Sequence, residues 1–386
     1  MQRRRYKALA MVLALGIVAA GCGSDDDDDE ATGDDTEQGS DSGDGGGEIE
    51  GPPAVTLEDE CEAAKAEGVE APEGFKVNLV TDIGRVDDGT FNQFAFEAME
   101  AAADCFGFET SYIETVSEAD YNTNISTSLQ DNPNVLITNG FLIATDTLAA
   151  AQNNPDVDFI GVDQFQEEFP DNYVGVQFRE DQGGYMAGVL AASLSESGVI
   201  GVVGGREDVP PVVRFVNAFE QGALSVNPDI EVLSVYNESF TAPDKGASDA
   251  AQFIGEGADV IFGAGGQTGS GAIAAAAEQG VWAIGVDQDE YFTTFNGGDA
   301  PGSEYLATSA VKRVDLAVFR NIVASIKGEF QGGLYTLEAA NDGITYAPFH
   351  DADLPEEAVE ALEEARAGLA DGSIDTGVDP VTGLPN

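Results

Sequence analysis

Positively charged residues are scarce in this 386-residue chain, which has 16 lysines and arginines against 71 aspartates and glutamates. A nucleic-acid-binding surface needs clustered lysine and arginine to neutralise phosphates, so no nucleic-acid partner is predicted. The formal net charge of −55 indicates a strongly solvated surface or adaptation to a saline environment, where salt screens repulsion between like charges. The sequence leaves both interpretations open.

Histidine is nearly absent, because His350 is the only one. One histidine excludes metal sites with two histidine ligands, and the chain has no G-x-S-x-G turn for a serine hydrolase. The glycine-rich residues 263–271 match neither a dinucleotide fingerprint nor a phosphate-binding P-loop. We therefore predict no catalytic residues, no metal and no cofactor, and interpret His350 as a surface residue.

Cysteine is also rare, with three residues and no Cys-x-x-Cys motif that would indicate zinc or a redox pair. Cys61 and Cys105 remain once Cys22 is assigned to the targeting signal described next. Outside the cytoplasm two such thiols usually oxidise, so a Cys61–Cys105 disulfide is predicted. Two free, buried thiols are the alternative.

The longest apolar run near the N-terminus covers only residues 8–20, too short to span a bilayer of ~30 Å comfortably. It follows a basic segment with three arginines and a lysine, and it ends at Gly21-Cys22. This order is typical of a lipoprotein signal peptide over residues 1–21, with Cys22 lipidated as the mature N-terminus. An ordinary secretory signal is the alternative. The predicted location is the extracytoplasmic face of the cell membrane, held by lipid.

Most of the segment 22–60, namely residues 23–53, contains almost no apolar side chains and is rich in aspartate, glutamate, glycine and serine. Such a composition cannot offset the entropy of ordering, so the segment is predicted to be an acidic, disordered tether. No spacing in it resembles a calcium-binding EF-hand loop.

From residue 76 onward, short apolar runs alternate with helix-like segments, which predicts largely parallel, doubly wound α/β sheets. Strands are expected at residues 77–81, 109–114, 134–139, 158–163, 173–178, 199–204, 230–236, 259–265 and 281–287. Helices are expected at about 90–104, 119–130, 143–152, 212–226, 244–256, 269–279, 309–327 and 355–368.

The second half of this series repeats the first. The pentapeptide Ile-Gly-Val-Asp-Gln occurs at residues 160–164 and again at 284–288, an offset of 124. Equal spacing of like elements indicates two lobes of the same topology, as in type I periplasmic binding proteins whose lobes close around a ligand by a hinge. The predicted boundaries are 75–178 for the first lobe with a returning segment at about 306–335, 179–305 for the second lobe, and 336–386 for a C-terminal segment.

Several motifs resemble one family. The stretch VNLVTDIGRVDDGTFNQFAFEAM at residues 77–99 is similar to the opening signature of the basic membrane protein family, the substrate-binding lipoproteins of certain ABC importers. The resemblance continues through SFTAPDKG at 239–246, DVIFGAGGQTGSG at 259–271 and SAVKRVD at 309–315. It implies a receptor that captures a purine nucleoside for uptake, with a permease and an ATPase as separate partners. It favours a binding protein over an enzyme.

The family also implies which residues contact the base. Two phenylalanines sandwich the purine in nucleoside-binding members, and the matching residues are Phe91 and Phe240. The polar residues that contact the base in the family match Asp82 and Asn92. A carboxylate accepts from ring N–H or amino groups, and an amide can donate or accept. The alternative to these binding roles is that both rings are core aromatics and that Asn92 caps a helix.

Four further residues match family positions around the rest of the ligand. Asp163 matches a second cleft carboxylate, and Asp287, Gly266 and Lys312 match the residues that hold the ribose hydroxyls. The alternative to ligand binding is that the aspartates lie at strand ends and cap nearby helices, and that the lysine is a solvated helix residue.

Three other functions remain open from the sequence. A sugar receptor of the same fold would also stack aromatics on a ring and bind hydroxyls with aspartate and asparagine. A nucleoside hydrolase would need a calcium site of clustered aspartates on the loop after the first strand, which Asp82, Asp87 and Asp88 come near to forming. A surface lipoprotein that binds host or receptor proteins has no apolar patch or repeat in its favour.

Overall fold

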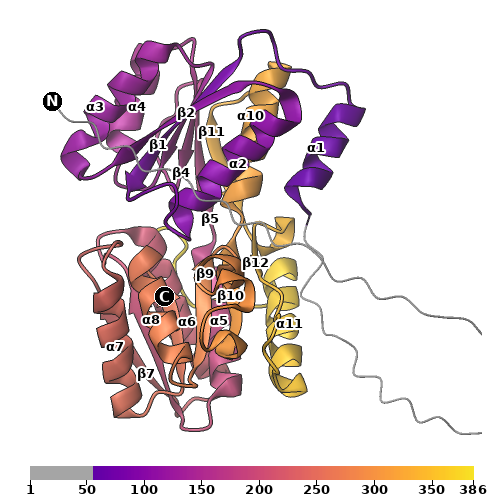
Figure 1. The fold of residues 1–386 in the computed structure, drawn as a ribbon. Helices are drawn as coiled ribbons and strands as arrows, with labels where there is room; N and C mark the ends of the chain where they lie inside the picture. The colour runs from indigo at the N-terminus through magenta and orange to yellow at the C-terminus, as the bar shows by residue number, and fades with distance from the viewer. Residues whose placement is uncertain (1–54) are drawn as a thin grey trace, which may run out of the picture. The chain divides into compact units, whose positions relative to one another are not determined.

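The structure, a computed structural model, describes residues 55–386, which belong to one unit of the chain that begins at residue 49 (Figure 1). The predicted signal peptide, the lipidation site Cys22 and most of the predicted tether lie outside the described residues. The last residues assigned to the tether, 57–60, are helical, because they belong to α1 (Leu57–Ala66), which has Thr56 as its N-cap. Within residues 55–386, no helix combines the length and the apolar content that a membrane crossing needs.

The first sheet is entirely parallel and has the strand order β11-β5-β4-β3-β1-β2. Its central strands are buried on both faces, which explains their continuous apolar, β-branched sequences. The strands are β1 (Lys76–Ile83), β2 (Glu109–Thr115), β3 (Val135–Asn139), β4 (Asp158–Val162), β5 (Tyr173–Phe178) and β11 (Gly333–Leu337).

The second sheet repeats this order as β12-β10-β9-β8-β6-β7, with β12 as its one antiparallel strand. Five strands of each sheet therefore follow the 2-1-3-4-5 order of doubly wound folds, which confirms the predicted pair of α/β lobes. The strands are β6 (Val199–Gly204), β7 (Glu231–Tyr236), β8 (Val260–Ala264), β9 (Trp282–Asp287), β10 (Leu306–Lys312) and β12 (Ile344–Tyr346).

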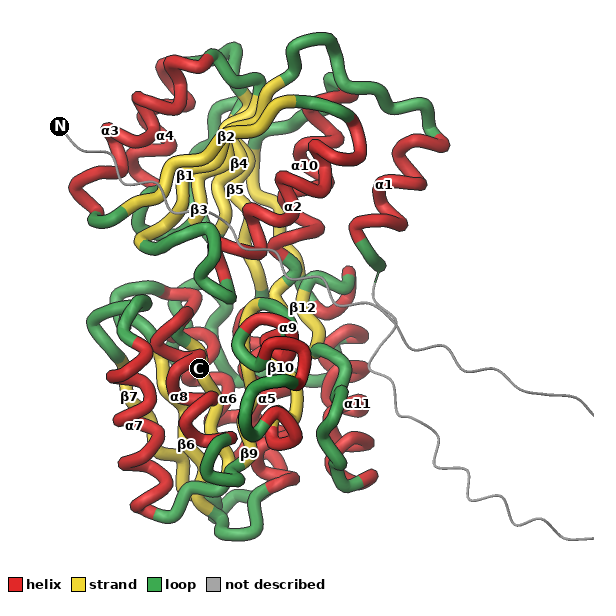
Figure 2. The backbone as a smooth tube through the Cα atoms, viewed as in Figure 1, coloured by secondary structure: helices red, strands yellow, loops and turns green. Residues whose placement is uncertain are grey.

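Helices cover both faces of each sheet (Figures 1 and 2). In the first lobe, α2 and α10 pack together on one face and α3 and α4 on the other. In the second lobe, the pairs are α5 with α6 and α7 with α8. The helices are α2 (Phe91–Phe106), α3 (Tyr121–Ser128), α4 (Ala144–Asn153), α5 (Glu180–Leu194), α6 (Pro210–Val226), α7 (Pro243–Glu256), α8 (Gly266–Ala277), α9 (Glu290–Thr293), α10 (Val314–Lys327) and α11 (Glu356–Asp371).

The sequence prediction is wrong at the start of one helix and at the C-terminal segment. The helix expected from residue 309 begins at Val314, because residues 306–312 form β10 and are buried within the second sheet. The chain therefore returns to the first lobe with α10 and β11 only. The segment 336–386 is not separate, since β12 joins the second sheet and α11 packs on α5.

The helix α5 is absent from the sequence prediction, and its packing explains why. Nearly all of its residues are buried, so it shows no polar face from which helical periodicity could be read. Glycines allow it to pack unusually closely on α6: a Cβ atom at Gly188 would lie 2.0 Å from the Phe219 carbonyl oxygen, and one at Gly184 2.3 Å from that of Phe215.

Replacing Gly188 by alanine should therefore destabilise the protein by about 1–3 kcal/mol, because the added methyl group forces α5 and α6 apart. Gly255, near the end of α7, is the matched control, since nothing lies within 4 Å of a Cβ atom placed there. Gly255→Ala should be neutral or stabilising by up to ~1 kcal/mol. Denaturant unfolding of both variants checks the prediction, and equal effects would contradict it.

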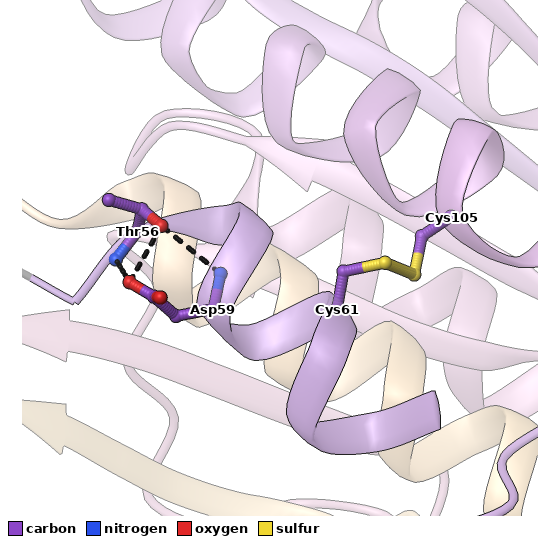
Figure 3. Close-up of a disulfide and its surroundings, with 4 residues drawn as sticks. All are labelled: Thr56, Asp59, Cys61 and Cys105. Carbon is purple, nitrogen blue, oxygen red and sulfur yellow. Dashed lines mark hydrogen bonds between the residues drawn. A yellow bond between two sulfur atoms is a disulfide. The ribbon is translucent and has the colours of Figure 1, made fainter. Parts of the chain in front are cut away.

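A disulfide joins Cys61 in α1 to Cys105 in α2, the pair expected from the sequence (Figure 3). The start of α1 is stabilised by a capping box, in which the Thr56 hydroxyl accepts from the Asp59 N–H and the Asp59 carboxylate accepts from the Thr56 N–H. The disulfide therefore ties α1 to the first lobe.

Candidate ligand-binding site

One cavity lies between the lobes, at the carboxyl ends of the parallel strands, where doubly wound sheets bind their ligands. It is partly open, and its empty space of about 660 Å³ includes solvent at the mouth. All eight ligand-binding residues expected from the sequence line it: Asp82, Phe91, Asn92, Asp163, Phe240, Gly266, Asp287 and Lys312.

Asp82 is held in a fixed orientation at the end of β1. Its Oδ1 atom accepts hydrogen bonds from the Tyr121 hydroxyl and from the Ile83 N–H at 2.7 Å. Its N–H donates to the Asn92 Oδ1 atom at 3.0 Å, which in turn fixes the Asn92 amide. Burial raises the pKa of Asp82 to about 6, an effect that the Tyr121 hydrogen bond partly offsets.

Gly140, after β3, is required for this arrangement. A Cβ atom there would lie 2.1 Å from the Asp82 Oδ2 atom, and the residue has a φ of +105°, which side chains rarely adopt. The Oδ2 atom makes no hydrogen bond to any residue of the described chain, so it is available to a ligand.

The two aromatic residues come from opposite lobes. Phe91 is the first residue of α2, in the first lobe, and Phe240 lies between β7 and α7, in the second. Phe240 fits closely against Gly205, where a Cβ atom would lie 2.3 Å from the ring. Both rings are only partly buried and line the cavity, which is unusual for core aromatics.

Lys312, at the end of β10, is buried and is surrounded by carboxylates from both lobes. Its Nζ atom lies 2.8 Å from Asp163 in the first lobe, 3.7 Å from Asp287 in the second and 3.5 Å from Glu180. It also lies 4.6 Å from the centre of the Phe91 ring. It is therefore a buried ion-pair residue and not a solvated helix residue.

Asp163 and Asp287 occupy equivalent positions in the two lobes. Each follows the central apolar part of its strand, and both have left-handed backbone angles, with φ of 60° and 68°. Burial raises the pKa of both groups, the charge of Lys312 lowers it, and the charge of Glu180 raises it further. Burial lowers the pKa of Lys312, but attraction to the carboxylates outweighs this effect and raises it.

Gly266 opens α8 with a φ of +56°. A Cβ atom at this position would lie 3.3 Å from the Phe240 carbonyl oxygen. The glycine therefore lets the α8 backbone approach that of Phe240 closely beside the cavity. The first N–H groups of α8 have no hydrogen-bond partners within the helix.

The lobes also contact one another beside the cavity. The Gln288 Nε2 atom donates to the Thr90 carbonyl at 3.0 Å, and the Thr293 hydroxyl donates to the Gly89 carbonyl at 2.8 Å. Arg206 pairs with Glu118 at 2.5 Å across the same boundary. The two hydrogen bonds hold the loop before α2 against the second lobe, and the ion pair holds the turn before α3 against it.

The calcium site considered for a hydrolase is not formed by its candidate residues. Asp88 accepts from the N–H groups of Thr90, Asn92 and Gln93 and so caps α2. Asp87 is exposed and pairs with Arg85 at 2.9 Å. Among residues 55–386, no group of three histidine, cysteine or acidic side chains is arranged to hold a metal ion.

Sequence reasoning missed several residues at this site. Thr90 and Phe141 line the cavity, and the buried Thr90 hydroxyl has no hydrogen-bond partner in the described part of the chain. Glu180 lies behind Lys312. Its place two residues after the end of β5, near a strand end like the three aspartates, was the available signal.

A family model described as "ABC transporter substrate-binding protein PnrA-like" matches residues 75–361. A "CD4+ T-cell-stimulating antigen" of Listeria innocua is 28% identical over 97% of this chain and 98% of its own length. An "ABC transporter nucleoside-binding protein BmpA" of Lactococcus lactis is 32% identical over 78% of this chain and 88% of its own. "Basic membrane protein B" of Borreliella burgdorferi is 29% identical over 71% and 80%.

Solved structures share the fold. A solute-binding protein of an ABC transporter system from Aeropyrum pernix K1 has a TM-score of 0.70 at 21% identity, covering 78% of this chain and 92% of its own. One from Conexibacter woesei has a TM-score of 0.64 at 22% identity, covering 78% and 98%. The predicted type I periplasmic-binding-protein architecture is confirmed.

Proposed function

Because the chain belongs to the family of PnrA-like ABC transporter substrate-binding proteins, we propose that it captures a purine nucleoside between its lobes for uptake. Membership in that family, which the sequence motifs predicted, makes the protein the substrate-binding component of an ABC transporter. Such a component binds a small molecule and works with permease and ATPase subunits. We further propose that lipid on Cys22 anchors it outside the cytoplasm and that it catalyses no reaction.

One observation carries the nucleoside proposal: aromatic rings from opposite lobes, Phe91 and Phe240, line the same cavity as oriented carboxylates. A flat base stacked between two rings gains ~1–3 kcal/mol per stack. Asp82 has a free oxygen to accept from the base, and Asp287 suits a pair of ribose hydroxyls. The relative from Lactococcus lactis is named for nucleoside binding, which agrees with this reading.

The charges at the site favour an uncharged ligand. Four aspartates line the cavity (Asp82, Asp88, Asp163 and Asp287) against one lysine, Lys312. A phosphate group entering this site would meet uncompensated negative charge, which costs several kcal/mol at protein interfaces. We therefore propose that nucleosides are accepted and nucleotides rejected.

Isothermal titration calorimetry of the full chain tests the proposal directly. The panel is adenosine, guanosine, inosine, uridine, ribose and adenosine monophosphate, each at low and high salt because of the charge of −55. We expect a purine nucleoside to bind, with ribose and the monophosphate at least about tenfold weaker. Heat with ribose or another sugar, and none with any nucleoside, would replace this function with sugar binding.

The affinity should also depend on pH through Asp82, whose pKa is raised to about 6 by burial. Protonation below that value removes the acceptor, so binding should weaken as the pH falls, by about tenfold between pH 7 and pH 5. Titrations at both pH values with Asp82→Asn as the control check this. The variant should bind more weakly at pH 7 and lose the share of the pH dependence that Asp82 contributes. Any remaining dependence would come from Asp88 and Asp163, whose pKa values burial raises to about 6 and about 7. An equal pH dependence in both proteins would assign it to another group.

A further inference from the structure

A second layer of charge lies behind Lys312, outside the residues that line the cavity. Glu180, the first residue of α5, is fully buried, and its Oε2 atom accepts from the Arg214 Nε atom of α6 at 2.7 Å. Its Oε1 atom lies 3.5 Å from the Lys312 Nζ atom and has no hydrogen-bond partner among the described residues. One carboxylate is thus shared between two buried cations.

The fold holds this pair rigidly. The glycine-mediated approach of α5 and α6 brings the two helices together, and Arg214 is almost as buried as Glu180. The other side of the guanidinium donates to the Val381 carbonyl at 3.2 Å, and Asn217, one turn along α6, donates to the Gly383 carbonyl at 2.6 Å. The C-terminal residues therefore fix Arg214 from behind, although they lie beyond the family match that ends at residue 361.

We propose that Glu180 and Arg214 are positioning residues that hold the Lys312 ammonium group at the place from which it contacts the ligand. This inference rests on the proposed function, in which Lys312 contacts ribose hydroxyls. Neither residue lines the cavity, so each acts through Lys312 and not on the ligand itself.

The balance of forces on Lys312 explains the need for Glu180. The charged groups that face its Nζ atom are Asp163 from the end of β4, Asp287 from the end of β9 and Glu180 from α5. Asp163 belongs to the opposite lobe and forms the shortest contact. Without Glu180, no charge would hold the ammonium group toward α5, and the uncompensated Arg214 would repel it. The group would therefore pivot away from α5 about its contact with Asp163.

The double variant Glu180→Gln/Arg214→Met tests the inference. Removing one partner of a buried pair alone can prevent folding, whereas removing both charges is often tolerated. We expect the double variant to bind inosine about tenfold more weakly, since coupled residues in one network interact at this level. Binding of hypoxanthine, which lacks the ribose, should change less than about twofold, because additivity holds for groups that share no contact.

Glu60→Gln is the matched control, because Glu60 forms a partly buried ion pair with Arg320 in the first lobe, at 2.6 Å, away from the cavity. It should leave both affinities unchanged. A double variant that binds inosine as tightly as the wild type would overturn the inference. So would an equal loss for inosine and hypoxanthine, since a merely structural role would weaken both.

A crystal structure of the unliganded double variant separates this inference from the nucleoside proposal. We expect the Lys312 Nζ atom to move by more than about 0.5 Å away from residue 180 while it keeps its contact with Asp163, a shift beyond the tolerance of a positioned site. If the wild type binds no nucleoside but this shift occurs, the proposed ligand is wrong and the positioning role stands. An unmoved Nζ atom overturns the positioning role whatever the ligand.

Discussion

Replacing Lys312 by methionine is expected to lower the free energy of unfolding by about 3–5 kcal/mol and to abolish tight ligand binding. The variant keeps the apolar stem but removes the one cation that Asp163, Asp287 and Glu180 surround. Asp163 and Asp287 would then lie buried beside the cavity without a counter-charge, while Glu180 would keep only Arg214. Denaturant unfolding and calorimetry with the best ligand of the panel measure the two effects.

The loss of stability should depend on pH. Burial already raises the pKa of Asp163 and Asp287, and without the lysine both values rise further. A carboxyl group whose pKa is higher in the folded state binds protons on folding, so it favours folding as the pH falls. The destabilisation should therefore be smaller at pH 5 than at pH 8.

Lys76→Met is the matched control. Lys76 pairs with Glu109 of β2 at 3.5 Å, and the two side chains are 37% and 78% exposed. Exposed pairs contribute only about 0.2–1 kcal/mol, so this variant should unfold almost like the wild type. An equal decrease in the free energy of unfolding for both variants would mean that the buried charges at the site stabilise the protein no more than exposed ones.

Removing both aromatic rings, as Phe91→Ala/Phe240→Ala, should cost about 2–6 kcal/mol of nucleoside binding, the sum of two stacks at ~1–3 kcal/mol each. Each single variant should lose about half of that free energy. The rings come from different lobes, so the double variant also removes the apolar contact by which a bound base would join them. Calorimetry with the best purine nucleoside measures all three variants.

Phe96→Ala controls for the loss of an aromatic ring from α2. The Phe96 ring packs edge-on against Tyr112, 5.2 Å between centres, and does not line the cavity. Its removal should leave affinity unchanged. If the double variant bound a nucleoside as well as the Phe96 variant does, the stacking sites would have to lie elsewhere.

Much of the fold could be predicted because its signals are local. Buried parallel strands carry continuous apolar runs, and nine such runs match strands of the two sheets. The repeated Ile-Gly-Val-Asp-Gln sequence marked Asp163 and Asp287 as equivalent strand ends. The carboxyl ends of parallel strands share one edge of a sheet, so placing these aspartates beside a ligand needed no further information.

Other features gave no local signal. α5 has no polar face, and β10 reads as the start of a helix because the burial that makes it a strand comes from its neighbours β9 and β12. The hydrogen bond from Gln288 to the Thr90 carbonyl joins residues 198 positions apart. Nothing near either residue in the sequence indicates the other.

The sequence by itself determined the residue types at the site and the strands that deliver them, because hydrophobic periodicity and strand-end position are properties of neighbouring residues. Only the tertiary structure decided how the charges are shared. Lys312 meets Asp163 across the lobe boundary and Glu180 from behind, at 2.8 Å and 3.5 Å. Coulombic energies depend on such distances and on burial, which the packing of α5 on α6 and the contact of the two lobes set.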